Sequence, residues 1–368
     1  MNYKLTLTIL AICILFNDCS TTKSGNNQIS RLNAKELIPY GRSNINNDQN
    51  LELIGSACNF GFSFEGRECS ISASVPAWLD HNYLQYELDG VYQKRLRISS
   101  GSAEPIIISA PDYGKHIVWI FKATEAQTSP VFIKSVVGRN IKPLQRPVMP
   151  LIEFIGNSIT CGAAADPSEV PCGTGMYHDQ HNAYMAYGPR VARALHVNFI
   201  MSCVSGIGIY RNWNSNGPTM PEVYEKTSLQ EQDTNHWDFA RYKPNIVSIA
   251  LGTNDFSRGD GKKERLPFDS AVFVNSYIRF IQLIKTKYPS ARIALLSSPM
   301  LNGDSRIKIQ HCLSSVKNGI DALYSSDKPV ALFFFNPMQA RGCSGHPNVE
   351  DHAILANELQ PFFKGLLQ

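Results

Sequence analysis

Apolar and polar residues alternate with two different rhythms in the two parts of the chain. Between about residues 34 and 140, short runs rich in Ile, Val, Phe and Tyr are separated by Gly, Asp, Asn and Pro, and no helical period of comparable length appears. Short strands at a spacing of about 8–12 residues are typical of an antiparallel sandwich or barrel. We therefore predict a β-sandwich domain over 34–140, with strands in 51–64, 68–76, 82–90, 94–100, 104–110, 115–123 and 130–138.

From Leu151 the pattern changes to continuous apolar strands that alternate with amphipathic helices. This alternation predicts an α/β domain over 151–368, whose central parallel sheet is covered by helices on both faces. The expected strands lie in 151–156, 197–206, 245–255, 292–299 and 330–337, and the expected helices in 183–196, 269–288, 307–326 and 349–367. The segment 141–150 contains three prolines, which is typical of a linker between domains.

The first residues differ in composition from both domains. The apolar segment 5–16 has the length of a signal-peptide core and is short for a membrane span. We predict a signal peptide over 1–19 and a tether over 20–33. Cys19 lies just after the apolar segment, as the lipidated cysteine of a bacterial lipoprotein would, although Asn17 and Asp18 stand where small residues usually precede that cysteine. The protein is therefore expected to be exported to the periplasm or cell surface, with membrane attachment through a lipid on Cys19.

Export makes disulfides possible. Nine cysteines less Cys13 and Cys19 leave seven, an odd number, so at least one thiol should stay free. Cys58 with Cys69, and Cys161 with Cys172, are near enough in sequence to close loops, although two unconnected buried thiols fit each pair equally well.

Composition excludes some classes of function. The 368 residues are 43% hydrophobic and 18% charged, as in a soluble globular protein, and the net charge of +4 is spread without a basic cluster. A nucleic-acid partner would need such a cluster, so none is expected. We expect a monomer.

The loops after the predicted parallel strands carry the candidate chemistry, because ligands in such folds bind outside the carboxyl ends of the strands. These loops contain Ser158, Gly206, Asn254 and His346. Acyl transfer to a serine needs a hydroxyl, a base and donors for the oxyanion, and this set offers each of them. Each motif alone is more often structural; the combination at successive strand ends favours catalysis.

The same residues carry a family resemblance. The stretches "FIGNSITCG", "SCVSGIGIYRNW", "LGTNDF" and "HPNVEDHAILANEL" resemble the four blocks of the SGNH (GDSL-type) hydrolase superfamily. Their details are most similar to carbohydrate esterase family 2, the acetyl-xylan esterase-like enzymes. "IPYGR", "YELDG" and "GKHIVWIFKATEA" resemble the jelly-roll domain that precedes the hydrolase domain in that family. The resemblance implies Ser158 as nucleophile, His346 as base, and the Ser158 N–H, Gly206 and Asn254 as the oxyanion hole, with no cofactor or metal.

Two positions depart from the superfamily pattern. Asn157 replaces the usual Asp before the serine, and Cys343 stands where an Asp three residues before the histidine commonly orients it. Members of family 2 that use a Ser-His dyad hold the imidazole with a main-chain carbonyl, and this chain is expected to be similar. His352 competes for the base role, but it lies inside the predicted last helix, where a packing role is favoured.

The surroundings of the site indicate the substrate. The loop 163–184 is long and polar enough to be a binding loop. Trp213 and Tyr210 could stack on sugar faces, and rings buried between the domains are the alternative. His178 and His181 suggest a metal pair, but no partner motif supports one.

We predict a serine-dependent carbohydrate O-acetyl esterase acting on acetylated sugars or polysaccharide oligomers. One alternative is an SGNH lipase or thioesterase, or a peptidoglycan or sialic-acid deacetylase, with the same blocks. Another is a non-catalytic, surface glycan-binding lipoprotein.

Overall fold

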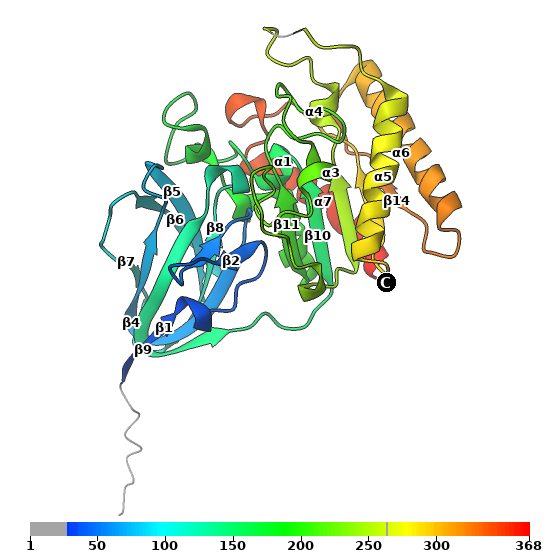
Figure 1. Ribbon diagram of the computed structural model, residues 1–368. Helices are drawn as coiled ribbons and strands as arrows, with labels where there is room; N and C mark the ends of the chain where they lie inside the picture. The colour runs from blue at the N-terminus through cyan, green and yellow to red at the C-terminus, as the bar shows by residue number, and fades with distance from the viewer. Residues whose placement is uncertain (1–27, 263) are drawn as a thin grey trace, which may run out of the picture.

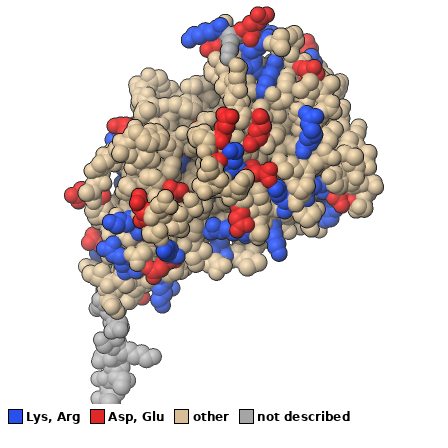
Figure 2. All heavy atoms as spheres, viewed as in Figure 1, with Lys and Arg blue, Asp and Glu red and all other residues tan. Residues whose placement is uncertain are grey.

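A computed structural model describes residues 28–262 and 264–368 and shows two domains packed side by side (Figure 1). The predicted signal peptide over 1–19 and the lipid attachment at Cys19 lie outside the described residues. No helix in the described part is long and apolar enough to span a membrane. On the face shown in Figure 2, acidic and basic side chains are interspersed.

The N-terminal domain is the predicted antiparallel β-domain. Its sheet has nine strands in the order β2-β3-β9-β4-β8-β5-β6, with β1 on β9 and β7 on β4. The strands are β1 (Ile29–Asn33), β2 (Ser43–Ile45), β3 (Leu51–Leu53), β4 (Asn59–Ser74), β5 (His81–Leu88), β6 (Val91–Ser99), β7 (Ile106–Ser109), β8 (Lys115–Lys122) and β9 (Val131–Leu144), with short 3-10 helices η1 (Ala34–Glu36) and η2 (Ala126–Thr128).

The long strands β4 and β9 organise this domain. They pair with each other through several register shifts, and β4 also pairs with β8 along its first half and with β7 along its second half. The alternating apolar residues of both strands, with Phe60, Phe62 and Phe64 fully buried, form one core. The short, alternating runs in the sequence therefore fold around a single hydrophobic centre.

The domain starts earlier and ends later in the structure than the sequence indicated. β1 begins at Ile29, inside the predicted tether, because residues Ile29–Asn33 pair with β9. β9 continues to Leu144, inside the predicted linker, and Pro143 is part of this strand. Pairing with neighbouring strands thus extends the domain at both boundaries into polar residues, whose own sequence shows little of the apolar pattern of a strand.

The C-terminal domain is the predicted α/β domain. Its five parallel strands have the order β11-β10-β12-β13-β14. The elements are β10 (Leu151–Gly156), α1 (Ser158–Cys161), η3 (Tyr177–Gln180), η4 (Ala183–Met185), α2 (Tyr187–Leu195), β11 (Asn198–Cys203), α3 (Met220–Val223), η5 (Phe239–Arg241), β12 (Ile246–Ala250), α4 (Thr253–Phe256), α5 (Ser270–Lys287), β13 (Arg292–Leu296), α6 (Gly303–Leu323), β14 (Ala331–Phe333), η6 (Cys343–Gly345) and α7 (Val349–Leu367).

Both faces of this parallel sheet are covered. Ile152 and Phe154 of β10 pack with residues of α2 and α7, whereas Ile155 packs with residues of α5 and α6. Successive residues of a strand point to opposite faces, so a fully apolar strand needs a helical layer on each side. The arrangement leaves the carboxyl ends of the strands as the place where loops can gather.

A buried arginine joins the two domains. Arg42, 1% exposed, reaches from the N-terminal domain to the edge strand β11, where its Nε donates to Ser202 Oγ at 3.0 Å. Its other nitrogens donate to the carbonyl oxygens of Lys226 and Tyr224 at 2.7 and 3.0 Å. Ser202 donates to the buried carboxylate of Glu153 in β10 at 2.6 Å. The N-terminal domain is therefore anchored to the sheet that carries the candidate site.

Candidate active site

Ser158 lies at the end of the central strand β10, where the chain turns into α1. Asn157 caps this short helix, because its side-chain oxygen accepts the Ile159 N–H at 3.1 Å. Gly156 is required at the turn, since a Cβ there would lie 2.0 Å from Thr160 Oγ1. The unusual Asn157 thus performs the capping that an aspartate would also perform, and the turn places the serine at the carboxyl edge of the sheet.

His346 contacts this serine. Its Nε2 lies 2.9 Å from Ser158 Oγ, and its Nδ1 lies 3.0 Å from the carbonyl oxygen of Ser344. A carbonyl only accepts hydrogen bonds, so Nδ1 carries the proton and Nε2 is free to accept the proton of the serine. The expected main-chain carbonyl behind the imidazole is therefore present. Burial lowers the pKa of His346 below its ordinary value, which keeps the ring neutral.

The disulfide in the structure joins Cys172 to Cys343. The sulfur of Cys343 is therefore bonded to that of Cys172, and no thiol remains at this position to orient His346. The bond links the long loop after the nucleophile to η6, directly before His346. It attaches the histidine loop covalently to the rest of the site.

Neither of the two candidate cysteine pairs forms a disulfide, and for Cys58 and Cys69 the alternative of two unconnected buried thiols is confirmed. Cys58 and Cys69 are free and buried; Cys58 directly precedes β4, and Cys69 lies in the second half of that strand. Cys161 is buried in α1 with its thiol toward Glu125, while Cys172 lies in an exposed loop. The expectation of a free thiol is confirmed: Cys58, Cys69, Cys161, Cys203 and Cys312 are free in the described residues.

The candidate oxyanion donors follow the two strands that flank β10. Gly206 comes after β11 with φ +75°, a conformation that favours glycine, and Asn254 lies in α4 after β12. Within the described residues, the backbone N–H groups of Ser158 and Gly206 have no hydrogen-bond acceptor. The Asn254 amide donates to the carbonyl oxygen of Ile207 at 2.7 Å and keeps a second N–H. The turn at Ser158 and the loops that follow β11 and β12 therefore hold unused hydrogen-bond donors.

Tyr177 in η3 was missed by the sequence reasoning. Its hydroxyl lies 3.4 Å from His346 Nε2 and 3.3 Å from Ser205 Oγ. Its ring packs edge-on against His181, with ring centroids 4.8 Å apart. Burial raises the pKa of Tyr177, so the hydroxyl stays protonated and can donate. Its position in the long loop after the nucleophile was the only sequence signal.

The two predicted aromatic residues line two different hollows of the surface. A hollow of about 470 Å³ is lined by Gly206, Ser205, Gln127 and Trp213. Trp213 is 44% exposed, and its backbone N–H donates to the Gly206 carbonyl oxygen at 2.8 Å. This hollow, which we call the Trp213 groove, adjoins the candidate oxyanion loop.

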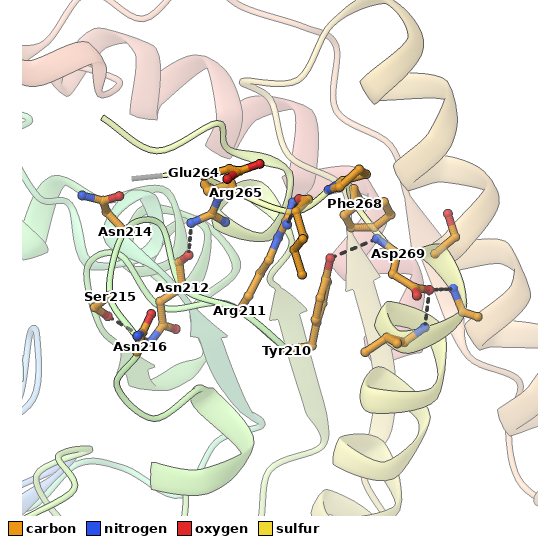
Figure 3. A pocket seen from close by; sticks show the side chains of 15 residues that line it. Tyr210, Arg211, Asn212, Asn214, Ser215, Asn216, Glu264, Arg265, Phe268 and Asp269 are labelled. Atoms are coloured by element: carbon orange, nitrogen blue, oxygen red, sulfur yellow. Dashed lines mark hydrogen bonds between the residues drawn. The ribbon is translucent and has the colours of Figure 1, made fainter. Parts of the chain in front are cut away.

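Tyr210 faces a different hollow, of about 960 Å³ (Figure 3). Its ring packs against Phe268, and its hydroxyl accepts the Asp269 N–H at 3.1 Å. Tyr210 does not line the Trp213 groove. Of the two aromatic residues, we keep only Trp213 as a candidate sugar contact.

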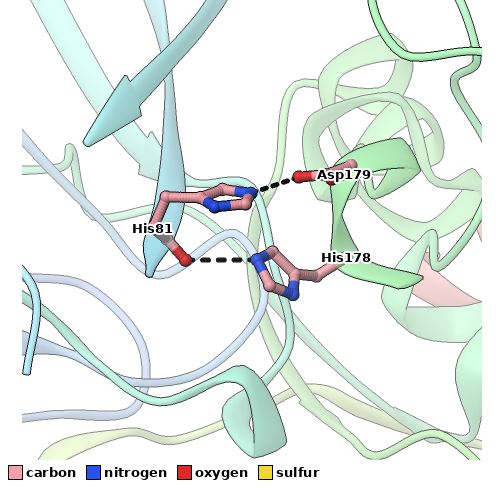
Figure 4. A group of neighbouring side chains, drawn as sticks. All are labelled: His81, His178 and Asp179. Atoms are coloured by element: carbon pink, nitrogen blue, oxygen red, sulfur yellow. Dashed lines mark hydrogen bonds and ion pairs between the residues drawn. The ribbon is translucent and has the colours of Figure 1, made fainter. Parts of the chain in front are cut away.

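A group of His81, His178 and Asp179 has metal-ligating atoms within 4.8 Å of one another (Figure 4). His81 Nε2 contacts Asp179, while its Nδ1 faces Asp80 at 2.5 Å and Arg97 at 2.9 Å. Both nitrogens of His81 are thus already engaged, and a cationic side chain adjoins them. We interpret this group as a hydrogen-bond network between the domains.

The histidines outside the dyad have other roles. Burial lowers the pKa of His178 to about 4, while His181 turns away from it and lies 3.4 Å from Glu125 Oε1. His352 is fully buried in α7, where its Nδ1 accepts the Tyr187 N–H at 3.3 Å and its ring stacks on Tyr187. Burial lowers the pKa of His352 to about 3. The packing role expected for His352 fits this environment.

Comparisons with known proteins agree with this architecture. The family model described as carbohydrate esterase 2 N-terminal matches residues 40–147, and that of the GDSL-like lipase/acylhydrolase family matches residues 154–324. An acetylxylan esterase/glucomannan deacetylase of Cellvibrio japonicus (strain Ueda107) is 30% identical over 288 residues, which are 73% of this chain and 77% of the relative.

Two solved structures share the fold. A family two carbohydrate esterase from Cellvibrio japonicus aligns with a TM-score of 0.78 and 24% identity over 92% of this chain and 98% of that one. A family two carbohydrate esterase from Clostridium thermocellum, in complex with cellohexaose, aligns with a TM-score of 0.76 and 27% identity over 90% and 99%. The predicted family and fold are confirmed. The chain belongs to carbohydrate esterase family 2 and is a hydrolase that acts on carboxylic ester bonds.

Proposed function

We propose that this enzyme removes acetyl groups from acetylated sugars or polysaccharide oligomers through an acyl-enzyme on Ser158. The single observation that carries the proposal is the 2.9 Å contact between Ser158 Oγ and His346 Nε2. A serine hydroxyl becomes a nucleophile when a positioned base takes its proton. The names of the relatives, acetylxylan esterase and glucomannan deacetylase, support the acetyl group and the carbohydrate.

The first half of the reaction transfers the acetyl group. His346 Nε2 takes the proton of Ser158 as Oγ attacks the ester carbonyl carbon. The resulting oxyanion accepts hydrogen bonds from the N–H groups of Ser158 and Gly206 and from the Asn254 amide. The C–O bond to the sugar then breaks, and His346 returns its proton to the leaving sugar hydroxyl.

The second half releases acetate. His346 deprotonates a water molecule that attacks the acetyl-serine, and the same donors stabilise the second oxyanion. The intermediate collapses, Ser158 recovers its proton from His346, and acetate leaves. The Ser344 carbonyl holds the imidazole in one tautomer through both halves, which is the main task of the third member in a triad.

The Trp213 groove supports a carbohydrate substrate. An indole face suits the apolar face of a sugar ring, and the polar side chains of Gln127, Gln230 and Gln232 in the same groove suit hydroxyl groups. A lipase or thioesterase would need an apolar groove for its acyl chain instead. Turnover that falls steeply from nitrophenyl acetate to longer acyl esters separates these possibilities.

The remaining alternatives differ in substrate or in activity. A peptidoglycan or sialic-acid deacetylase would use the same chemistry, and acetate release from a panel of acetylated glycans distinguishes it. A glycan-binding protein without activity would not need a serine and a histidine in contact. Glycan affinity without ester turnover would favour that alternative.

The direct test is Ser158→Ala. It removes the nucleophilic hydroxyl and adds no bulk to the turn, so release of nitrophenol from the acetate ester should fall by about 10³-fold or more. Ser326→Ala, at an exposed serine in the turn after α6, is the control and should keep wild-type kcat and KM. If folded Ser158→Ala turns over like the wild type, the proposed function is wrong.

A further inference from the structure

One buried carboxylate beside the site comes from the N-terminal domain. Glu125 follows β8, at the start of η2, and its side chain is 3% exposed. The mechanism above gives it no role. An unpaired buried charge is strongly destabilising, so its presence requires partners that bind it.

Those partners all belong to the hydrolase domain. Glu125 Oε2 accepts the backbone N–H of Ser205 at 2.5 Å and lies 3.7 Å from the thiol of Cys161 in α1. Its other oxygen lies 3.4 Å from His181 Nε2. The Ala164 N–H donates to Nδ1 of His181, so Nε2 carries the proton and donates to Glu125. One carboxylate therefore connects the helix of the nucleophile, the loop of the oxyanion donor and the loop of Tyr177.

The backbone that presents Glu125 is itself fixed. Lys122, also fully buried, donates from Nζ to the carbonyl oxygen of Thr124 at 3.1 Å, to its hydroxyl at 2.8 Å, and to the carbonyl oxygen of Glu125 at 2.6 Å. Burial raises the pKa of Glu125, but the hydrogen bonds from His181 and Ser205 outweigh it and hold the pKa below the ordinary value. The carboxylate is thus held in place and charged.

We propose that Glu125 is a positioning residue of the esterase, because its carboxylate fixes the direction in which the Ser205–Gly206 loop presents the Gly206 N–H. This inference rests on the proposed function, in which that N–H binds the oxyanion. Ser205 directly precedes Gly206, so a charge-assisted bond to the Ser205 N–H restricts the peptide next to the donor. The N-terminal domain then completes the catalytic site of the other domain.

Glu125→Gln tests the proposal. The amide has the size of the carboxylate, but its oxygen can serve only one of the two donors, so its NH₂ group must face either Ser205 N–H or His181 N–H. We expect kcat on nitrophenyl acetate to fall about 10- to 100-fold with KM changed by less than about threefold, since the loss concerns the transition state. The inhibition constant of an alkyl boronic acid, which forms an anionic tetrahedral adduct on Ser158, should rise by the same factor.

Glu87→Gln is the matched control. Glu87 of β5 is also buried and also accepts a hydrogen bond across the domain interface, from the Tyr184 hydroxyl, but it has no contact with the oxyanion loop. This variant should lower the melting temperature and keep kcat and the boronate inhibition constant. If Glu125→Gln does not fold, Glu125→Asp, which keeps the charge and withdraws it by one methylene, should show the same pattern with a smaller loss.

The outcomes are distinguishable. Wild-type kcat in folded Glu125→Gln or Glu125→Asp overturns the positioning role, as does a fall in kcat without a rise in the boronate inhibition constant. Ser158→Ala is measured in the same series. If Ser158→Ala is inactive and Glu125→Gln has wild-type kinetics, only this inference is refuted. If Ser158→Ala is active, the proposed function itself is refuted.

Discussion

At the scale of single residues, the proposed chemistry depends on which ring nitrogen of His346 carries the proton. His346 is half-buried, and its Nδ1 is committed to the Ser344 carbonyl, so Nε2 faces Ser158 as an acceptor. A carbonyl supports the imidazolium less than a carboxylate does, and burial also disfavours the charged ring. Both effects keep the resting base neutral. Because no carboxylate stabilises the imidazolium, more of the stabilisation of the transition state must come from the hydrogen-bond donors to the oxyanion.

The pH dependence of kcat/KM follows from this environment. Burial lowers the pKa of His346 below 6.5, so the neutral base persists to lower pH than for an ordinary histidine. We expect kcat/KM on nitrophenyl acetate to be constant at neutral pH and to fall only as pH drops through a midpoint below 6.5. A midpoint at or above 6.5 for the acid limb would contradict the described environment of the ring.

Ser158, Gly206, Asn254 and His346 could be predicted as site candidates from the sequence because each follows a strongly apolar strand, and parallel strands end at one edge of a sheet. Tyr177 and Glu125 could not. Glu125 belongs to another domain, and nothing in its local sequence distinguishes a buried carboxylate from a solvated one.

At the scale of elements, the histidine loop is held to the segment that follows the nucleophile. The Cys343 N–H donates to the carbonyl oxygen of Ala164 at 2.9 Å, and the Val349 N–H donates to that of Ala165 at 3.1 Å. The disulfide from Cys343 to Cys172 adds a covalent link to the same loop. The short loop over 343–345 therefore has little freedom to move His346 away from Ser158.

Cys172→Ala tests the role of this link. Removing a native disulfide costs about 2–5 kcal/mol of folding stability. Because a small displacement of a catalytic group slows catalysis, we also expect kcat to fall about 3- to 30-fold with KM little changed. Treating the wild type with a reductant should lower kcat in the same way. The control Cys312→Ala, at a free buried cysteine in α6, should keep the wild-type kcat. Unchanged kcat with lowered stability would show that the hydrogen bonds alone hold the base.

The disulfide is a feature of the site that could not be predicted from the sequence. Its cysteines are separated by 171 residues, so only the folded chain brings them together. Proximity in sequence made Cys58 and Cys69 one of two open candidate pairs, and both thiols are free in the structure. β1 was missed for a related reason: it is a strand because β9 offers it a partner. The long elements of the parallel sheet and its helices were predictable, since their apolar periods are continuous.

At the scale of the whole molecule, the two domains act as one unit. Arg42 of the N-terminal domain is fully buried, its guanidinium donates to groups of the hydrolase domain, and the buried carboxyl group of Glu153 lies nearby. Glu125 and Glu87 cross the same interface with further hydrogen bonds. We infer that the β-domain is part of the structure of the active site.

Arg42→Met tests this coupling. It removes the buried cation near Glu153, which keeps only its hydrogen bonds from Ser202 and Tyr224, and losing one member of a buried charged network costs about 3–5 kcal/mol. We expect urea unfolding of the wild type to show one transition, and Arg42→Met to unfold at much lower urea or in two steps. Arg67→Met, at an exposed arginine of the same domain that stacks on Tyr113, is the control and should change little. Equal stability of the two variants would argue against a coupled interface.

The acetyl-enzyme itself is the most direct evidence for the proposed chemistry. Rapid acid quenching of wild-type enzyme during turnover of an acetyl ester, followed by intact-mass and peptide analysis, detects any covalent intermediate. The mechanism predicts one acetyl group on the peptide that contains Ser158, absent in Ser158→Ala and accumulating when deacetylation is slowed. Acetate release at the full rate with no acetylation of Ser158, or with the acetyl group on another residue, would contradict it.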